Sequence, residues 1–135
     1  MISVITFNQS IINSWNISDG VQTQQLIENI ENEKPTGMTN IYLATTEALN
    51  ILKTEDVDQY NVSIILMTDG LSNKGNLYDV RKTYNDIKRD IPIYSIMFGS
   101  ASASQLDDIA KLSNAKVFDG RTNLLEAFKK VRSYN

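Results

Sequence analysis

Short apolar runs along the chain predict five β-strands. Three of the runs are rich in β-branched or aromatic side chains and end at turn residues, namely Ser3–Phe7, Val62–Thr68 and Pro92–Phe98. Two weaker runs predict strands at Ile11–Asn16, joined to the first by a tight turn, and at Lys116–Phe118. The run at Val62–Thr68 is apolar on both faces, a pattern typical of a parallel sheet that helices cover on each side.

Between these strands, apolar residues recur at every third or fourth position and predict five amphipathic helices. Their apolar positions fall within 26–30, 41–52, 77–87, 106–110 and 124–134. Polar residues ahead of the helices are expected to cap their free amides. The expected caps are Thr39 or Asn40, Asn76, Ser104, and Thr122 or Asn123. Pro35 and Gly37 are expected to end the first helix.

The order of these elements predicts an α/β fold. We expect a three-layer, Rossmann-like, mostly parallel sheet with helices on both faces and an antiparallel hairpin strand at one edge. A chain of 135 residues fits a single domain, expected over residues 1–135. In such sheets ligands bind beyond the carboxyl ends of the strands, where Asp69, Gly99 and Asp119 fall.

Composition narrows the chemistry of any site. The formal net charge is −3 and the pI is about 4.9, so the protein repels phosphate backbones and nucleic acid is not an expected partner. The sequence contains no cysteine and no histidine, which excludes thiolate zinc sites and Ser-His-Asp or Cys-His catalysis. Any metal must be a hard, oxygen-bound cation.

No apolar stretch reaches the roughly 20 residues of a membrane span, and Met1 opens a strand without the basic start of a secretory signal.

Two segments carry the candidate chemistry. Gly37-Met38-Thr39-Asn40 stands at the start of a predicted helix, and Thr68-Asp69-Gly70 stands at the end of a predicted strand. Together they resemble the von Willebrand factor type A domain, and the tail is similar to bacterial members, including some in exported proteins. In that family three loops form a metal-ion-dependent adhesion site. The two segments match the second and third loops, and the resemblance extends from Ser3 to the end of the chain.

The resemblance implies roles for particular residues. Thr39 would be a direct hydroxyl ligand of Mg²⁺ or a similar divalent cation, and Asp69 a carboxylate that reaches the metal through water. The cation would keep one open position and bridge the domain to an acidic side chain of a protein partner. The loop residues expected to shape this site are Gly37, Asn40, Gly70 and Ser72.

One family motif, Asp-x-Ser-x-Ser after the first and central strand, occurs nowhere in the sequence. The serines within 100–104 lack the acid and follow a different strand. We therefore expect a domain without its amino-terminal strand and helix, in which cation binding is weak or absent. By the family's strand order, Ser3–Phe7 and Val62–Thr68 would then face a gap about one strand wide. Direct pairing of the two edges, self-association with another copy, or a segment of a longer protein would close it.

Other interpretations use the same residues differently. In one, the site is non-functional and the chain is a metal-free interaction or scaffolding remnant, with Thr39 as a helix cap and Asp69 as a turn residue. Ser72 and Asn73 fit simple turn positions, and Asp119-Gly120-Arg121 is expected to be a turn before the last helix.

An enzyme is not expected. The strand that ends at Asp69 also resembles the acidic strand of P-loop nucleotidases, but Gly-x-x-x-x-Gly-Lys-Ser/Thr does not occur in the sequence. A phosphotransfer site at Asp69 would need further carboxylates close to it and a lysine that closes a later strand. The run at Pro92–Phe98 offers no such lysine.

Overall fold

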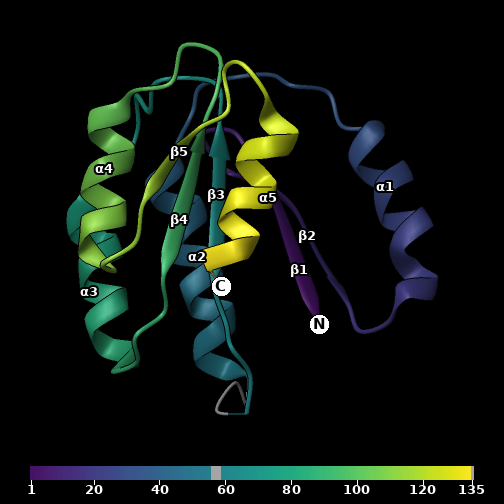
Figure 1. The fold of residues 1–135 in the computed structure, drawn as a ribbon, viewed down its shortest axis with the longest axis horizontal. Coiled ribbons are helices and arrows are strands. Elements are labelled where there is room, and N and C mark those ends of the chain that lie inside the picture. Colours follow the sequence, from purple (N-terminus) through teal and green to yellow (C-terminus); the bar gives the residue numbers. More distant parts are fainter. Residues whose placement is uncertain (56–58, 135) are drawn as a thin grey trace.

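The predicted strands form two separate sheets. The computed structural model describes residues 1–55 and 59–134. Strands β1 (Ile2–Phe7) and β2 (Ile11–Ile17) pair antiparallel as a hairpin. The second sheet is parallel, with the strand order β3 (Ile64–Thr68), β4 (Ile93–Met97), β5 (Val117–Asp119). These bounds lie within two residues of the predicted ones, and the α/β fold with its antiparallel hairpin is confirmed (Figure 1).

The helices also follow the predicted pattern. They are α1 (Thr23–Glu31), α2 (Ile41–Thr54), α3 (Leu77–Ile87), α4 (Ala103–Leu112) and α5 (Leu124–Tyr134). A short 3-10 helix, η1 (Gly20–Gln22), precedes α1 and was not predicted. Asn40 and Asn76 cap α2 and α3 as expected, and the Asn123 side chain accepts a hydrogen bond from the Glu126 N–H at 3.0 Å. Within the described ranges, no helix has the length and apolar character needed to cross a membrane.

Two predicted helix boundaries are wrong. Ser102, and not Ser104, caps α4, because the backbone of Ser102 is extended and its hydroxyl accepts the Gln105 N–H. Helix α1 ends at Glu31, before Pro35 and Gly37. After the end of this helix, the side chain of Glu33 reaches back to the hairpin, where it accepts hydrogen bonds from β1 and β2.

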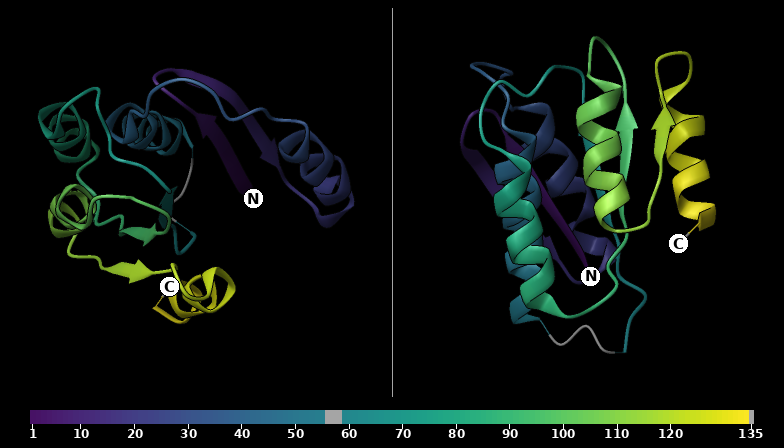
Figure 2. Two further views of the ribbon diagram at one scale, coloured as in Figure 1. Left: turned by 90° about the horizontal axis from the view of Figure 1, so that it is seen from above. Right: turned by 90° about the vertical axis from the view of Figure 1, so that its left-hand side faces the viewer.

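Strand β4 is the centre of the second sheet and is buried along its whole length. On one face, α2, α3 and α4 form the main core, in which Leu49 and Val80 are completely buried. On the other face, α5 packs on β4 through Ala127 and Val131. Helices therefore cover both faces of the sheet, as the amphipathic pattern predicted (Figure 2).

Strands β1 and β3 belong to different sheets, so direct pairing of these two edges does not occur in the described residues. Helix α2 packs on both strands and holds the sheets together. The Ile64 N–H donates to the Pro92 carbonyl at 2.9 Å, and the Thr68 carbonyl accepts the Phe98 N–H at 3.2 Å. The backbone N–H and carbonyl groups of successive residues in a strand point to opposite edges. Those of Ile65 therefore point to the edge of β3 that faces away from β4.

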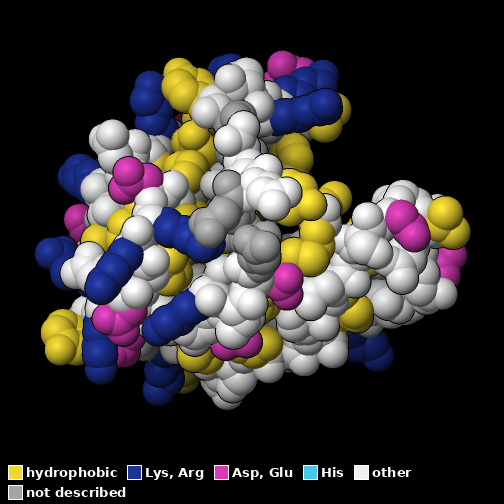
Figure 3. Space-filling model, turned by 90° about the horizontal axis from the view of Figure 1, so that it is seen from below, with side chains coloured by type: hydrophobic (Ala, Val, Ile, Leu, Met, Phe, Trp, Pro, Cys, Tyr) yellow, Lys and Arg dark blue, Asp and Glu magenta, His cyan; other side chains and the backbone are white. Residues whose placement is uncertain are grey.

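The surface between the hairpin and the second sheet is partly apolar. Seen from below, the molecule is hollowed between its main body and the projecting α1, and apolar side chains line part of the hollow (Figure 3). Exposed apolar side chains on the flanking elements include Ile2 of β1, Ile27 of α1 and Phe128 of α5. Exposed apolar surface of this kind commonly marks a site of interaction.

Candidate functional site

Thr39 and Asp69 lie on neighbouring loops at the carboxyl end of β3. Asp69 directly follows β3, and Thr39 directly precedes the cap of α2. A Cβ atom placed on Gly70 would lie 3.5 Å from the Thr39 hydroxyl oxygen, so this hydroxyl is beside the residue that follows Asp69. The structure thus brings the two segments together in one site, which we call the rim site and define as Thr39 and residues 69–73.

Ser72 and Asn73 fix the backbone on both sides of Thr39. The Thr39 N–H donates to the Asn73 side-chain oxygen at 3.1 Å, and the Asn73 N–H donates to the Thr39 carbonyl at 3.1 Å. The Ser72 hydroxyl lies 3.2 Å from the same carbonyl and accepts the Ile41 N–H at 3.2 Å. The side chain of Ser72 therefore fixes the loop after β3 to the backbone at the start of α2.

Gln105 of α4 binds the backbone of the loop after β3, and the sequence did not predict this contact. Its amide nitrogen donates to the Ser72 carbonyl at 2.8 Å, and its amide oxygen accepts the Ser72 N–H at 2.9 Å. One half-buried side chain on α4 thus satisfies both backbone groups of Ser72. The two residues are 33 positions apart, and no local pattern in the sequence signals such a contact.

The backbone of Asp69 is held by the loop after β4. Its carbonyl accepts the Ser100 N–H at 2.8 Å and the Ser100 hydroxyl at 3.2 Å. Gly99 has a φ of +56°, and a Cβ there would lie 2.7 Å from the Asp69 carbonyl oxygen and 2.9 Å from the Asp69 Cβ. A glycine is required at this position both for its backbone conformation and for the close approach.

The other predicted loop residues have structural roles in this geometry. The Asn40 side chain accepts the Leu43 N–H at 3.0 Å as the cap of α2, and its N–H donates to the Asn8 carbonyl at 2.8 Å. Gly37 has a φ of +85°, and a Cβ there would lie 3.1 Å from the Asn8 amide nitrogen. These contacts attach the turn of the hairpin to the loop that carries Thr39.

The side-chain oxygens of Thr39 and Asp69 in the rim site have no partner among residues 1–55 and 59–134. Among the described residues, neither the Thr39 hydroxyl nor the exposed Asp69 carboxylate forms a hydrogen bond or an ion pair. Both are hard oxygen donors, the kind that Mg²⁺ prefers. They supply only part of an octahedral shell, because the described residues contain no group of three or more acidic, histidine or cysteine side chains that could hold a metal. The two oxygen donors are therefore of the type that binds a divalent cation, but two donors are too few to complete its coordination shell.

Asp119 is engaged in a local turn after β5. Its carboxylate accepts hydrogen bonds from the Arg121 N–H at 3.0 Å and from the Arg121 Nε at 2.9 Å. The side-chain hydrogen bond from Arg121 is the largest cause that lowers the pKa of Asp119, from 3.8 to about 2. This exposed carboxylate is therefore already paired with a cation.

A doubly covered α/β sheet with oxygen donors at the carboxyl rim defines a Rossmann-like binding domain. The chain belongs to the von Willebrand factor type A domain family, whose family model matches residues 1–131. Domains of this family are generally associated with protein interactions, are usually non-catalytic adhesion modules and often bind divalent cations. Searches of curated proteins and of solved structures gave no match.

Proposed function

We propose that this domain binds a protein partner through the rim site, with a divalent cation such as Mg²⁺ between the domain and an acidic side chain of the partner. The observation that carries the proposal is the placement of the Thr39 hydroxyl beside the 69–70 loop. Neither this hydroxyl nor the Asp69 carboxylate has a partner among the described residues. The cation would supply an open coordination position for the partner's carboxylate.

The residues of this chain prepare the site before any ligand arrives. Asn73 fixes the backbone of Thr39, and Ser100 fixes the backbone of Asp69. Because both loops are held by hydrogen bonds, little conformational freedom is lost when the hydroxyl and the carboxylate take a ligand. The rim is therefore suited to recognition.

We further propose that the remaining oxygen ligands come from a segment outside these 135 residues. The chain has no Asp-x-Ser-x-Ser motif. In the described part of the chain, β1 and β3 each have one edge that pairs with no strand, and α2 packs on both strands. An extended segment that pairs with these edges would end at the same rim as Asp69. A strand followed by Asp-x-Ser-x-Ser would add the missing carboxylate and hydroxyls.

Calorimetric titration with MgCl₂ and MnCl₂ tests the rim site. We expect weak, millimolar binding to the chain that is lost in Asp69→Asn and in Thr39→Val, because each removes one of the two donors. Asp107→Asn is the matched control, since Asp107 is an exposed carboxylate on α4 that lies outside the rim site. Equal heats in all four proteins would contradict the proposal.

A second titration tests the missing segment. A synthetic peptide of about six apolar residues, a typical strand length, followed by Asp-Ala-Ser-Ala-Ser is added before MnCl₂. We expect the affinity for Mn²⁺ to rise at least about tenfold, because more oxygen ligands reach the cation. A peptide with Asn-Ala-Ala-Ala-Ala at its end is the control. Equal affinity for Mn²⁺ with both peptides would refute the proposal that an outside segment supplies the missing ligands.

The alternative function is a metal-free interaction or scaffolding domain. It is favoured by the short supply of donors among the described residues. In that case neither cation produces heat or a thermal shift at millimolar concentration, and the partner binds equally well in a chelator. The open edges of β1 and β3 would then be the interaction surface, including for self-association between copies.

A further inference from the structure

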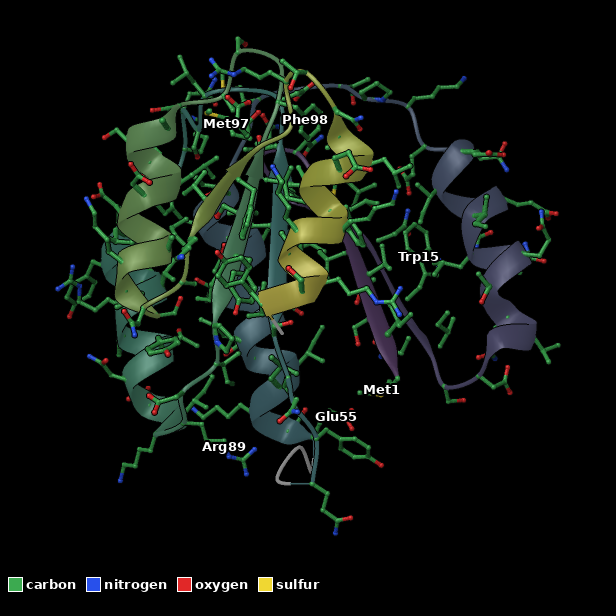
Figure 4. The ribbon with its side chains drawn as sticks, viewed as in Figure 1. Met1, Trp15, Glu55, Arg89, Met97 and Phe98 are labelled. Carbon is green, nitrogen blue, oxygen red and sulfur yellow. The ribbon has the colours of Figure 1, made fainter. Side chains whose placement is uncertain are left out.

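A pocket lies away from the rim site, between β2 and α1. It is lined by Asn13, Trp15, Asn29, Asn32 and Glu33, and we call it the amide pocket. Its volume is about 430 Å³, within the usual range of small-molecule sites. Trp15 lies in the space between the hairpin and α1 (Figure 4). Asn29 of α1 and Asn32, the residue that follows α1, line the same pocket.

The floor of the amide pocket is held in place by its own hydrogen bonds. One oxygen of Glu33 accepts a hydrogen bond from the Asn13 amide, and the same oxygen accepts the Thr6 hydroxyl at 3.3 Å. The Asn29 side-chain oxygen accepts the Gln25 amide at 3.2 Å. These bonds fix the carboxylate and one amide before any ligand binds, which limits the entropy lost on binding.

Several polar groups of the pocket stay available. Within the described part of the chain, the Trp15 indole N–H and the Asn32 side chain form no hydrogen bond, and the second Glu33 oxygen has no partner. Donors and acceptors therefore stand side by side on a concave surface. Lysine and arginine are not among the lining residues, so the pocket has no cation that would hold an anionic ligand.

We propose that the amide pocket binds a neutral saccharide. Hydroxyl groups both donate and accept, so they match a lining of amides with one carboxylate. The indole adds an apolar ring with a polar N–H, which suits the mixed apolar and hydroxylated faces of a sugar ring. An anionic sugar would meet the Glu33 carboxylate without a compensating cation. The pocket is a site separate from Thr39 and Asp69, and its function does not depend on a metal.

The single tryptophan of the chain makes a direct test possible. In an NMR titration with methyl glucoside and with N-acetylglucosamine, we expect a saturable shift of the Trp15 indole N–H signal. The same titration with glucuronate, which has a carboxylate on the same ring, should give binding at least about tenfold weaker because of Glu33. No saturable shift with either neutral sugar would overturn the proposal.

Variants separate recognition from folding. Asn32→Ala removes an exposed amide and should weaken neutral-sugar binding about threefold to tenfold, the value of one lost hydrogen bond. Asn50→Ala is the matched control, because Asn50 is an exposed amide on α2 outside the pocket. Trp15→Phe keeps an aromatic ring without the N–H and should weaken binding detected on the sugar signals. Equal binding by all variants would place the sugar elsewhere and refute the assignment.

Discussion

Gly99 controls how closely the loop after β4 approaches Asp69. Its φ of +56° lies in the left-handed region, and the space where a Cβ would stand is occupied by Asp69 backbone and Cβ atoms. Gly99→Ala should lower the free energy of unfolding by at least about 1–2 kcal/mol, from the backbone conformation alone. Urea unfolding followed by circular dichroism measures the loss.

Gly20→Ala is the control for this substitution. Nothing lies within 4 Å of a Cβ at Gly20, so the same change there should alter the free energy of unfolding little or raise it slightly. If Gly99→Ala were as stable as Gly20→Ala, the close approach of Gly99 to Asp69 would be wrong.

The sequence predicted that Thr39 and Asp69 would lie at the same rim of the sheet, and it did not predict the contacts that surround them. Thr39 and Asp69 stand out because a hydroxyl and an acid occupy the ends of strongly patterned elements. The sequence left Thr39 and Asn40 as equal candidates for the cap of α2. In the structure Asn40 takes that role, which leaves the Thr39 hydroxyl free of capping.

Helix α4 is coupled to the rim site through Gln105. Gln105→Ala removes both hydrogen bonds to Ser72, each worth about 0.5–1.5 kcal/mol. Local opening of the loop should then be about 5-fold to 150-fold more frequent, and the Ser72 N–H should exchange faster by that factor. Hydrogen exchange followed by NMR measures the effect.

Gln105→Glu refines this result. A glutamate keeps the acceptor for the Ser72 N–H and loses the donor to the Ser72 carbonyl, so it should give an intermediate rate. Gln24→Ala, on α1, should leave the exchange at Ser72 unchanged. Unchanged exchange in Gln105→Ala would show that the loop is held without the α4 contact.

Strands and helices were predicted well because their signals are local. The run at 62–68 and the helix at 77–87 carry strong periodic patterns, and both elements form there. Errors occur where a distant contact decides, as at the end of α1, where Glu33 turns back to the hairpin. The cap of α4 is a different case, because Ser100, Ser102 and Ser104 are local alternatives and the structure uses Ser102.

Among the described strands, the open edges of β1 and β3 are expected to favour association between copies of the molecule. Strand β1 carries no charged side chain, and uncharged open edges recruit further strands. We expect the isolated chain to self-associate as its concentration rises, with protection of the amides in Val4–Thr6. Light scattering and hydrogen exchange measure these two effects.

Ile2→Lys places a charge on this edge at a residue that is 59% exposed and should shift the chain toward the monomer. Val21→Lys is the matched control, because Val21 is 88% exposed but lies outside the strands. A monomer at all concentrations, or equal association of both variants, would argue against the edge as the contact.

Helix α2 is the one described helix that packs extensively on both sheets, and no strand pairing crosses between them. The hairpin and α1 keep their own backbone ladder if they separate from the rest. They also bury few side chains, chiefly Ile17 and Leu26. We therefore expect two cooperative units of unequal strength, of which the smaller one opens first under denaturant. Urea unfolding would then show two transitions, and the later one would give the free energy of the larger unit.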